Sequence, residues 1–321
     1  MAAIKQLENG DLAEYGRHAA EYGSAFDSLE WLSIYGGNVR IYAILDDGGN
    51  IIGGFHLYRA KKFGMSFFLD PPFCPAIGPF LKIGECSYTT SLENWKKTLT
   101  AMAQLLDQIP YSIISLSLDK KIADMQPFIW KKFKVSPRFT YVLDLDNSID
   151  DIWKGMTNER RKNIKKSIKD GFAVQKTVDF NKLRPLAVKT FERQGEKKNS
   201  HYIDRILHEY ARTGNCFAFL TTRDGSPAAF TFCIYDSNTA FYLLGGHIDN
   251  CHHGAGTLAL WESIKYAKEM GLKNFDFEGS MLPNIERYIR GFGGRMVTYY
   301  RVSKAGLLLE MALKLYRREL F

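Results

Sequence analysis

The stretch 241–294 restricts the fold of this chain more than any other part of the sequence. It predicts a strand at 241–245, a helix at about 254–270 with apolar residues near the 3.6-residue period, and a second short strand at 274–277. Gly271 stands where a helix end favours a left-handed residue. Because a strand–helix–strand unit is a crossover connection, its two strands must lie parallel. The sequence therefore predicts an α/β fold with mixed sheets.

The loop before that helix has the residues of an anion-binding site. Gly254, Ala255 and Gly256 stand at the helix start, where unpaired backbone N–H groups and the helix dipole favour negative charge. Glycine also lets a phosphate approach the backbone closely. We therefore predict that these residues, together with His253, contact a pyrophosphate or nucleotide phosphate of a donor. A glycine-rich entry into a buried helix, with no ligand, is the alternative.

Several segments together resemble a known family. They are the run GGH, the loop and helix HHGAGTLALWESIKYAKEMGLKNFDFEGS, and the closing segment IERYIRGFGG. This pattern is similar to the C-terminal half of FemAB/FemX-type proteins, which are tandem acyltransferases of the GNAT fold that add amino acids to peptidoglycan precursors. The nearest likeness is to the bacterial branch of GNAT-like acetyltransferases. The resemblance covers 148–304 well and the first domain only by the order of its elements, and it implies two tandem GNAT-like domains.

Two departures from the family bear on the donor. Coenzyme-A-binding GNAT proteins place Arg or Gln before the glycines of their pyrophosphate motif, whereas this chain has Cys251. FemAB-type enzymes that use tRNA carry a long helical arm, whereas the polar stretch 194–200 is far too short for one. The resemblance therefore implies no tightly bound cofactor, and either acyl-CoA or aminoacyl-tRNA as the donor substrate.

Composition indicates an ordinary soluble chain. Apolar residues make up 45% and charged residues 24% of 321 residues, and there is no apolar run of about 18 residues that would predict a membrane span. The start lacks the pattern of a signal peptide, and five irregularly spaced cysteines favour a reducing compartment, so we expect a cytoplasmic protein. His247, His252 and His253 have no carboxylate or cysteine at metal-ligand spacing, so no metal site is predicted.

The division into domains is predicted near 147. Residues 1–147 read as a degenerate N-terminal GNAT-like domain, with a hairpin turn at 46–50 and a proline-rich loop at 71–75. Residues 148–321 read as the C-terminal GNAT-like domain, with the site and a C-terminal helix. Charges nearly balance in the first part, so the net charge of +8 comes from the second, which is consistent with an anionic partner or with a solvated basic surface.

A basic helix opens the second domain. It ends at Gly171, and its apolar stripe is predicted to be Ile164 and Ile168. The basic residues, predicted to face outward, include Arg160, Arg161 and Lys165. We predict that these three contact the phosphates of a substrate, with a solvated helix face as the alternative. A single helix with few aromatic residues is not a DNA-reading element, so no DNA partner is expected.

Direct acyl transfer to an amine needs a base for the ammonium proton, a donor to the oxyanion and an acid for the leaving group. Asp276 and Glu278 are the candidate bases, because they lie at the carboxyl end of a central strand, where open α/β sheets place their sites. A structural hydrogen bond is the alternative for Asp276. Tyr242 is the candidate hydroxyl donor, with a core position as the alternative.

The closing segment supplies the remaining candidates. Ser280 in the turn after the last strand, and Arg287 and Arg290 on the polar face of the last helix, are predicted to bind an acceptor carboxylate or phosphate. In coenzyme-A-dependent GNAT proteins a tyrosine on this helix often acts as the general acid. Tyr288 lies near that place, but the helical period assigns it to the buried stripe.

These observations predict an N-acyl or aminoacyl transfer from an activated donor to an amine on a bacterial cell-wall or cell-surface precursor. One alternative is a coenzyme-A-dependent N-acetyltransferase acting on a small amine. Another is a non-catalytic module that binds a nucleotide-sugar or RNA. The partners expected are an anionic precursor, a nucleotide-containing donor or tRNA, and the apolar and basic C-terminal helix at 305–320 either docks on its own domain or contacts a membrane surface.

Overall fold

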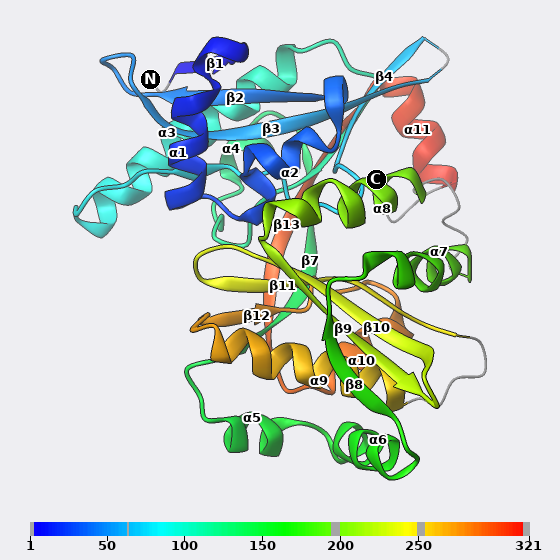
Figure 1. Cartoon of the computed structure of the whole chain (residues 1–321). Coiled ribbons are helices and arrows are strands. Elements are labelled where there is room, and N and C mark those ends of the chain that lie inside the picture. The colour runs from blue at the N-terminus through cyan, green and yellow to red at the C-terminus, as the bar shows by residue number, and fades with distance from the viewer. Residues whose placement is uncertain (1–2, 63, 194–199, 249–253, 317–321) are drawn as a thin grey trace. The chain divides into compact units, whose positions relative to one another are not determined.

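The computed structural model describes residues 3–62, 64–193, 200–248 and 254–316 (Figure 1). The chain forms two compact units, the first made of Met1–Arg138 with Thr298–Phe321 and the second of Phe139–Val297. The sequence places the domain boundary nine residues later, at 147/148, and assigns the C-terminal segment to the second domain. The structure assigns that segment to the first unit because Arg301–Ala305 pair with a strand there, a contact that periodicity does not reveal.

The first unit contains a mixed sheet with strand order β1-β2-β3-β4-β6-β13, and β5 pairs with β3. Its strands are β1 (Ala3–Gln6), β2 (Val39–Leu45), β3 (Ile51–Lys62), β4 (Met65–Leu69), β5 (Phe80–Leu81), β6 (Ile113–Ser117) and the end of β13 (Arg295–Ala305). Its helices are α1 (Leu12–Tyr22), α2 (Leu29–Ser33), α3 (Tyr88–Gln108), α4 (Gln126–Trp130) and α11 (Leu307–Tyr316). The hairpin predicted at 46–50 is confirmed by the β2–β3 pairing.

The second unit has the strand order β7-β12-β11-β10-β9-β8. Its strands are the end of β7 (Lys134–Asp144), then β8 (Ala173–Thr177), β9 (Cys216–Arg223), β10 (Ser226–Tyr235), β11 (Thr239–His247) and β12 (Asn274–Asp276). Its helices are α5 (Ile149–Gly155), α6 (Asn158–Lys169), α7 (Arg184–Arg193), α8 (Ser200–His208), α9 (Gly254–Glu269) and α10 (Pro283–Arg290). The strand–helix–strand unit predicted from the sequence is therefore β11, α9 and β12, and the two strands are parallel.

Side-chain alternation places different helices on the two faces of this second sheet. Thr231 of β10 hydrogen-bonds Ser263 of α9 at 2.6 Å between the hydroxyl oxygens, so α9 covers that face. The neighbouring Phe232 points the other way and packs on Phe180, at 5.7 Å between ring centroids, just before α7. The cavity described below lies among α6, α7, α9 and α10 at the end of β11.

Local signals fix the ends of the basic helix α6. The hydroxyl of Thr157 accepts a hydrogen bond from the Arg160 N–H at 3.4 Å at its start, and Gly171 adopts a φ of 82° just after its end. Two predictions about its faces are wrong. Ile168 is 59% exposed, whereas Arg160, predicted to face outward, is only 6% exposed.

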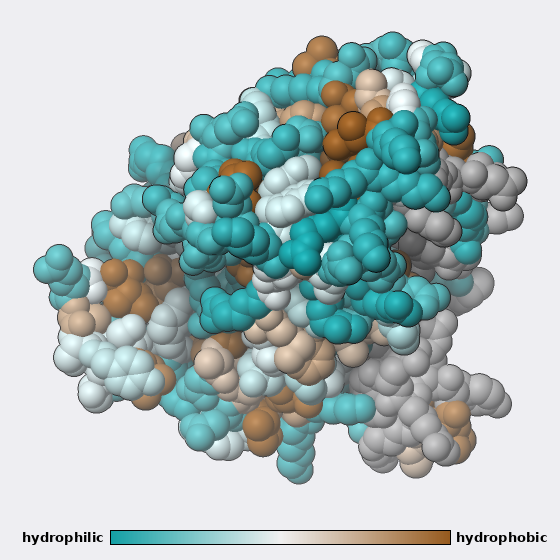
Figure 2. Space-filling model, turned by 90° about the horizontal axis from the view of Figure 1, so that it is seen from below, coloured by the Kyte–Doolittle hydropathy of each residue, from teal (hydrophilic) through white to brown (hydrophobic). Residues whose placement is uncertain are grey.

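The surface around α5 and α6 faces the viewer in Figure 2, which shows the molecule from below. It is largely hydrophilic, with hydrophobic residues in small groups. This matches a helix whose lysines are solvated and whose packing depends on few apolar contacts.

Candidate functional site: a cavity at the open end of strand β11

The two parallel strands of the second unit separate after the first third of β11. They pair at three positions, which end at Phe241 opposite Asp276. β11 then continues to His247, whereas the other chain segment turns away through Glu278 and Gly279, with φ of 62° and 65°. A Cβ atom on Gly279 would lie 2.1 Å from the carbonyl oxygen of Phe139, so the turn needs glycine there. One edge of β11 is therefore left uncovered by β12 beyond Phe241.

A β-bulge at Leu243 shapes this free end. Phe232 lies opposite Leu244 and Cys233 lies opposite Tyr242, so Leu243 is the extra residue. The inserted residue changes the side-chain alternation, which brings Tyr242 and Gly245 onto one face. A Cβ atom on Gly245 would lie 1.8 Å from the Tyr242 hydroxyl oxygen. The second glycine, at 246, leaves room in the same way for α7.

The separated strands border a cavity of about 500 Å³. This volume lies in the range of sites for small molecules or for the reactive part of a larger substrate. It is lined by Glu159, Arg160, Asn163, Thr190, Phe230, Tyr242, Gly245, Gly246, His247, Gly256, Asn284, Ile285, Tyr288 and Ile289. These residues come from four helices and two strands of the second unit.

Two tyrosines meet in this cavity, and both keep their protons at neutral pH. Burial and the neighbouring Tyr288 raise the pKa of Tyr242 well above its ordinary value. Burial also raises the pKa of Tyr288, against the opposing effects of a hydrogen bond with Thr257 and the charge of Arg160. The cavity therefore presents two hydroxyl groups that can donate hydrogen bonds or a proton to a reacting group.

Arg160 is held in the wall of the cavity by the closing helix. Its Nε donates to the carbonyl oxygen of Tyr288 at 3.3 Å, and its guanidinium carbon lies 4.7 Å from the centre of the Tyr288 ring. A Cβ atom on Gly291 would lie 2.9 Å from this arginine, so glycine is needed for the contact. The side chain thus supplies a buried positive charge beside the two hydroxyl groups.

The predicted bases lie outside the cavity lining. Asp276 is 4% exposed, and its Oδ1 accepts hydrogen bonds from the Thr140 hydroxyl at 2.6 Å and from the backbone N–H of Glu278 at 2.9 Å. This is the structural hydrogen bond that the sequence left open as an alternative. Glu278 is half-buried. Burial raises the pKa of the neighbouring Cys233 thiol, and the charge of Glu278 adds a little to this effect.

Of the residues predicted to hold the donor, Gly256 lines the cavity. Gly254 begins α9, and the carbonyl oxygen of Ala255 accepts a hydrogen bond from the Thr221 hydroxyl at 3.0 Å. His253 lies outside the described residues. The start of α9 therefore borders the cavity through Gly256.

The predicted substrate-binding residues are spread over the second unit. Arg160 lines the cavity, but Arg161 donates instead to the carbonyl oxygen of Lys154 at 2.8 Å and so caps α5. The Lys165 ammonium lies 5.9 Å from the centre of the Trp153 ring.

The other three predicted substrate-binding residues lie in the turn after β12 and in the closing helix α10. Ser280 accepts a hydrogen bond from the N–H of Leu282 at 3.1 Å, and Arg290 pairs with Glu286 at 2.7 Å. Arg287 has a side chain that is 73% exposed and lies 3.8 Å from Glu159. None of these three belongs to the described cavity lining.

Sequence reasoning missed Tyr288 and Thr257. The helical period correctly grouped Ile285, Tyr288 and Ile289 on one stripe of α10, but that stripe faces the cavity as well as the core. A tyrosine in an otherwise aliphatic stripe was the available signal, because a buried hydroxyl needs a polar partner. Thr257 gave no signal in the sequence, since threonine is common in the first turn of a helix.

The separated parallel strands, the glycine entry to α9 and the closing helix α10 all belong to the second unit. Residues 158–288 match the sequence model of the acetyltransferase (GNAT) domain, which covers this cavity and leaves the first unit unmatched. No curated protein matches the sequence. The resemblance to GNAT-fold acyltransferases inferred from the sequence is confirmed, and so is the mixed α/β fold class.

Solved structures extend the likeness to nearly the whole chain. FemX matches with a TM-score of 0.67 at 12% identity, over 93% of this chain and 96% of that one. L-PGS from Bacillus licheniformis matches with a TM-score of 0.56 at 14% identity, over 96% of each chain. A tandem GNAT protein from the clavulanic acid biosynthesis pathway matches with a TM-score of 0.53 at 13% identity, over 95% of this chain and 99% of that one. The chain therefore has the fold of these proteins.

Two further observations concern the described residues alone. No helix among them is long and apolar enough to cross a membrane. Their His, Cys, Asp and Glu side chains form no group of three or more that has the geometry of a metal site.

Proposed function

We propose that this protein transfers an acyl or aminoacyl group from an activated donor to the amine of a cell-wall or cell-surface precursor. The observation that carries the proposal is the cavity at the open end of β11, where the hydroxyl groups of Tyr242 and Tyr288 and the Arg160 guanidinium converge. Open strand edges and protonated hydroxyl groups are what a direct transfer between two bound substrates requires.

The reaction forms one C–N bond and breaks one C–S or C–O bond. The amine of the acceptor attacks the carbonyl carbon of the thioester or ester and gives a tetrahedral oxyanion, which receives a hydrogen bond from the Tyr242 hydroxyl. Collapse of this intermediate expels the thiolate or alkoxide, and the Tyr288 hydroxyl gives it a proton. The amine proton leaves through water towards Glu278, the candidate base that is half-buried, because Asp276 is buried and its Oδ1 already accepts two hydrogen bonds. The tyrosinate recovers a proton from solvent.

The charges around the site support an anionic or nucleotide-containing donor. α9 begins at Gly254, and its N-terminal dipole carries partial positive charge toward the cavity. Arg160 adds a buried guanidinium, which binds phosphate and carboxylate oxygens well. The likeness to FemX and L-PGS favours an aminoacyl donor on fold grounds alone.

A coenzyme-A-dependent N-acetyltransferase acting on a small amine is the second candidate. The observation that favours it is the match of 158–288 to the acetyltransferase domain, together with the Gly254-Ala255-Gly256 entry to α9. The tandem GNAT protein from the clavulanic acid pathway was solved without acetyl-coenzyme A, so its likeness bears on the fold and not on the donor. The two candidates share the cavity and differ in the donor and the acceptor.

A thermal-shift experiment on the pure protein separates them. Acetyl-coenzyme A, a nucleotide-activated muropeptide and bulk tRNA are tested singly, because a ligand at about a hundred times its dissociation constant adds about 2.7 kcal/mol of stability. A shift with the muropeptide or with tRNA, followed by transfer of a labelled aminoacyl group, supports the first proposal. A shift with acetyl-coenzyme A alone, followed by acetylation of a small amine, supports the second. Binding without any transfer contradicts both and favours a non-catalytic module.

A further inference from the structure

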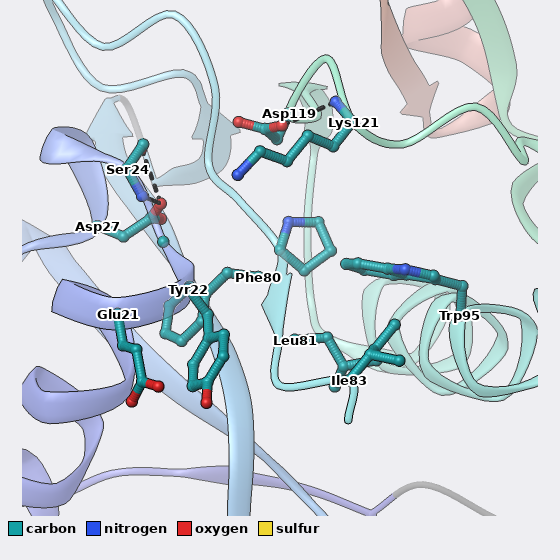
Figure 3. Close-up of a pocket in the computed structure, with 12 residues that line it drawn as sticks. Glu21, Tyr22, Ser24, Asp27, Phe80, Leu81, Ile83, Trp95, Asp119 and Lys121 are labelled. Atoms are coloured by element: carbon teal, nitrogen blue, oxygen red, sulfur yellow. Dashed lines mark hydrogen bonds between the residues drawn. The ribbon is translucent and has the colours of Figure 1, made fainter. Parts of the chain in front are cut away.

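A second cavity, of about 330 Å³, lies entirely within the first unit (Figure 3). The last turn of α1 and the residues just after it form one side, and Trp95 of α3 forms the wall opposite (Figure 3). Pro79 and Leu81 supply an apolar surface between them. Asp119 and Lys121 reach the cavity from the loop that follows β6.

Three carboxylates line this cavity, those of Glu21, Asp27 and Asp119, and the last two are held by hydrogen bonds before any ligand arrives. Oδ2 of Asp27 accepts hydrogen bonds from the N–H and the hydroxyl of Ser24, at 2.9 and 2.8 Å, and its Oδ1 lies 3.5 Å from Nδ1 of His56. Oδ1 of Asp119 accepts a hydrogen bond from the Lys121 N–H at 2.8 Å. Asp27 is 2% exposed, so its negative charge acts through a poorly solvated medium.

The negative charge of Asp27 acts on the neighbouring Asp119. Burial raises the pKa of Asp119, the Lys121 backbone N–H and ammonium lower it, and the charge of Asp27 raises it further. The charge of Asp27 therefore makes ionisation of Asp119 less favourable, and a positive group placed between them relieves this cost. The Lys121 side chain extends over the same cavity, where its ammonium attracts a negative group (Figure 3).

We propose that this cavity binds a small zwitterion with an apolar body, the chemistry of an α-amino acid such as leucine. The ammonium group of the ligand lies toward Asp119 and Asp27, its carboxylate lies toward Lys121, and its side chain packs on Trp95 and Leu81. The aromatic face of Trp95 adds to the attraction for the ammonium group. A neutral apolar ligand leaves all three charges unpaired, and a simple cation leaves Lys121 repelling it.

This inference goes beyond the proposed acyl transfer, because every residue in it belongs to the first unit. The experiment is a calorimetric titration of the whole protein with L-leucine, L-leucinamide and N-acetyl-L-leucine. The amide lacks the carboxylate and the acetyl derivative lacks the ammonium, and each is expected to bind about tenfold or more weakly than leucine, because a charged hydrogen bond is lost.

Three variants assign the charges. Lys121→Met is expected to abolish the preference for leucine over leucinamide, and Asp119→Asn, which keeps an acceptor for the Lys121 N–H, to reduce the preference for leucine over its N-acetyl derivative. Lys97→Met, an exposed lysine of α3 outside the cavity, is the matched control and is expected to change neither. Circular dichroism melting of each variant checks that it folds.

Any of three results overturns the proposal. One is that the three ligands bind equally, which makes the cavity an apolar cleft with no charge recognition. Another is that none gives heat at about 10 mM, ten times the weakest dissociation constant expected, about 1 mM. Loss of binding in Lys97→Met to the same extent as in Lys121→Met also contradicts it.

Discussion

The two units contain parallel strand pairs that end in opposite ways. In the first unit, β4 pairs with β6 up to its last residue, where Leu69 lies opposite Ser115. The next residue, Asp70, then accepts hydrogen bonds from the N–H of Ser117 at 2.6 Å and from Arg301 at 2.8 Å. In the second unit, pairing stops at Phe241 and β11 continues beyond it. One strand end is sealed by a carboxylate, and the other borders a cavity.

The difference comes from the residues that follow the last pair. The short acidic side chain of Asp70 accepts hydrogen bonds from the N–H and the hydroxyl of Ser117 on the neighbouring strand, so the sheet edge closes there without a ligand. An aromatic residue followed by a bulge and two glycines cannot do this, and it leaves the free edge of β11 beside Tyr242. Sheet topology alone therefore does not make a site. The residue that follows the last strand pair decides whether the edge of the longer strand is closed or left open.

The largest effect is expected at the open end of β11, where the proposed transfer takes place. Tyr288→Phe removes the proposed proton donor and is expected to lower the transfer rate about a hundredfold, about 2.7 kcal/mol in the barrier, with little change in stability. Steady-state transfer of the donor identified by thermal shift is the measurement. Tyr235→Phe, whose hydroxyl bonds the carbonyl oxygen of Gly214 far from the cavity lining, is the matched control. Equal rates in the Tyr288→Phe variant and the native protein rule out this role.

At the closed strand end of the first unit, substitution of Asp70 is expected to lower stability and to leave the activity unchanged. Asp70→Ala leaves the half-buried Arg301 without its carboxylate, and the expected loss in the free energy of unfolding is about 2–3 kcal/mol, toward the low end of the range for a broken buried pair. Urea unfolding measures it. Asp11→Ala breaks the exposed pair with Lys5 and is expected to leave the stability nearly unchanged, because solvent screens this pair. A larger effect on donor binding than on unfolding contradicts the contrast drawn between the two strand ends.

The third prediction concerns the space between Gly245 and the Tyr242 hydroxyl. Gly245→Ala places a methyl group where the Tyr242 hydroxyl now lies, so it is expected to destabilise the protein by about 1–3 kcal/mol and to weaken donor binding. Thermal melting and donor titration measure the two effects. Gly155→Ala, where a Cβ atom meets no atom within 4 Å, is the control and is expected to be nearly neutral. An unchanged melting temperature in Gly245→Ala means that the Tyr242 side chain can adopt another conformation, which contradicts this prediction.

Much of this fold follows from the sequence, but the cavity does so only in part. The order β11, α9, β12, α10 and the glycine entry at Gly254 are local patterns, and the structure confirms these elements. The bulge at Leu243 is a shift of one residue that no hydrophobic period records. The burial of Arg160 depends on Tyr288 and Gly291, about 130 residues away in the chain, so a helical period assigned it to solvent.

The predicted carboxylates also show that the sequence gives a residue's position but not its partners. The position of Asp276 at a strand end was correctly predicted, yet its hydrogen bond to Thr140 crosses 136 residues and fixes its direction. A carboxylate at a strand end gives the same sequence pattern whether it acts as a base or links two strands by hydrogen bonds. Only the partner distinguishes these roles, and the partner comes from the fold. Whether Asp276 or Glu278 takes the proton is therefore tested by substitution, with transfer rate and stability measured together.

The smallest predicted effect concerns the surface counterpart of the Asp70 contact. Glu286 accepts a hydrogen bond from the Tyr141 hydroxyl at 2.5 Å and pairs with Arg290 at 2.7 Å, which ties α10 to β7 within the second unit. The Tyr141 hydrogen bond, and then Arg290, lower the pKa of Glu286 in the folded state, so its contribution is present above the unfolded pKa and is lost as pH falls through the folded value. Glu286→Gln is therefore expected to lower stability slightly at pH 7 and hardly at all below about pH 4. Urea unfolding at both pH values measures the difference, and an equal loss at both shows that packing, not charge, holds α10 in place.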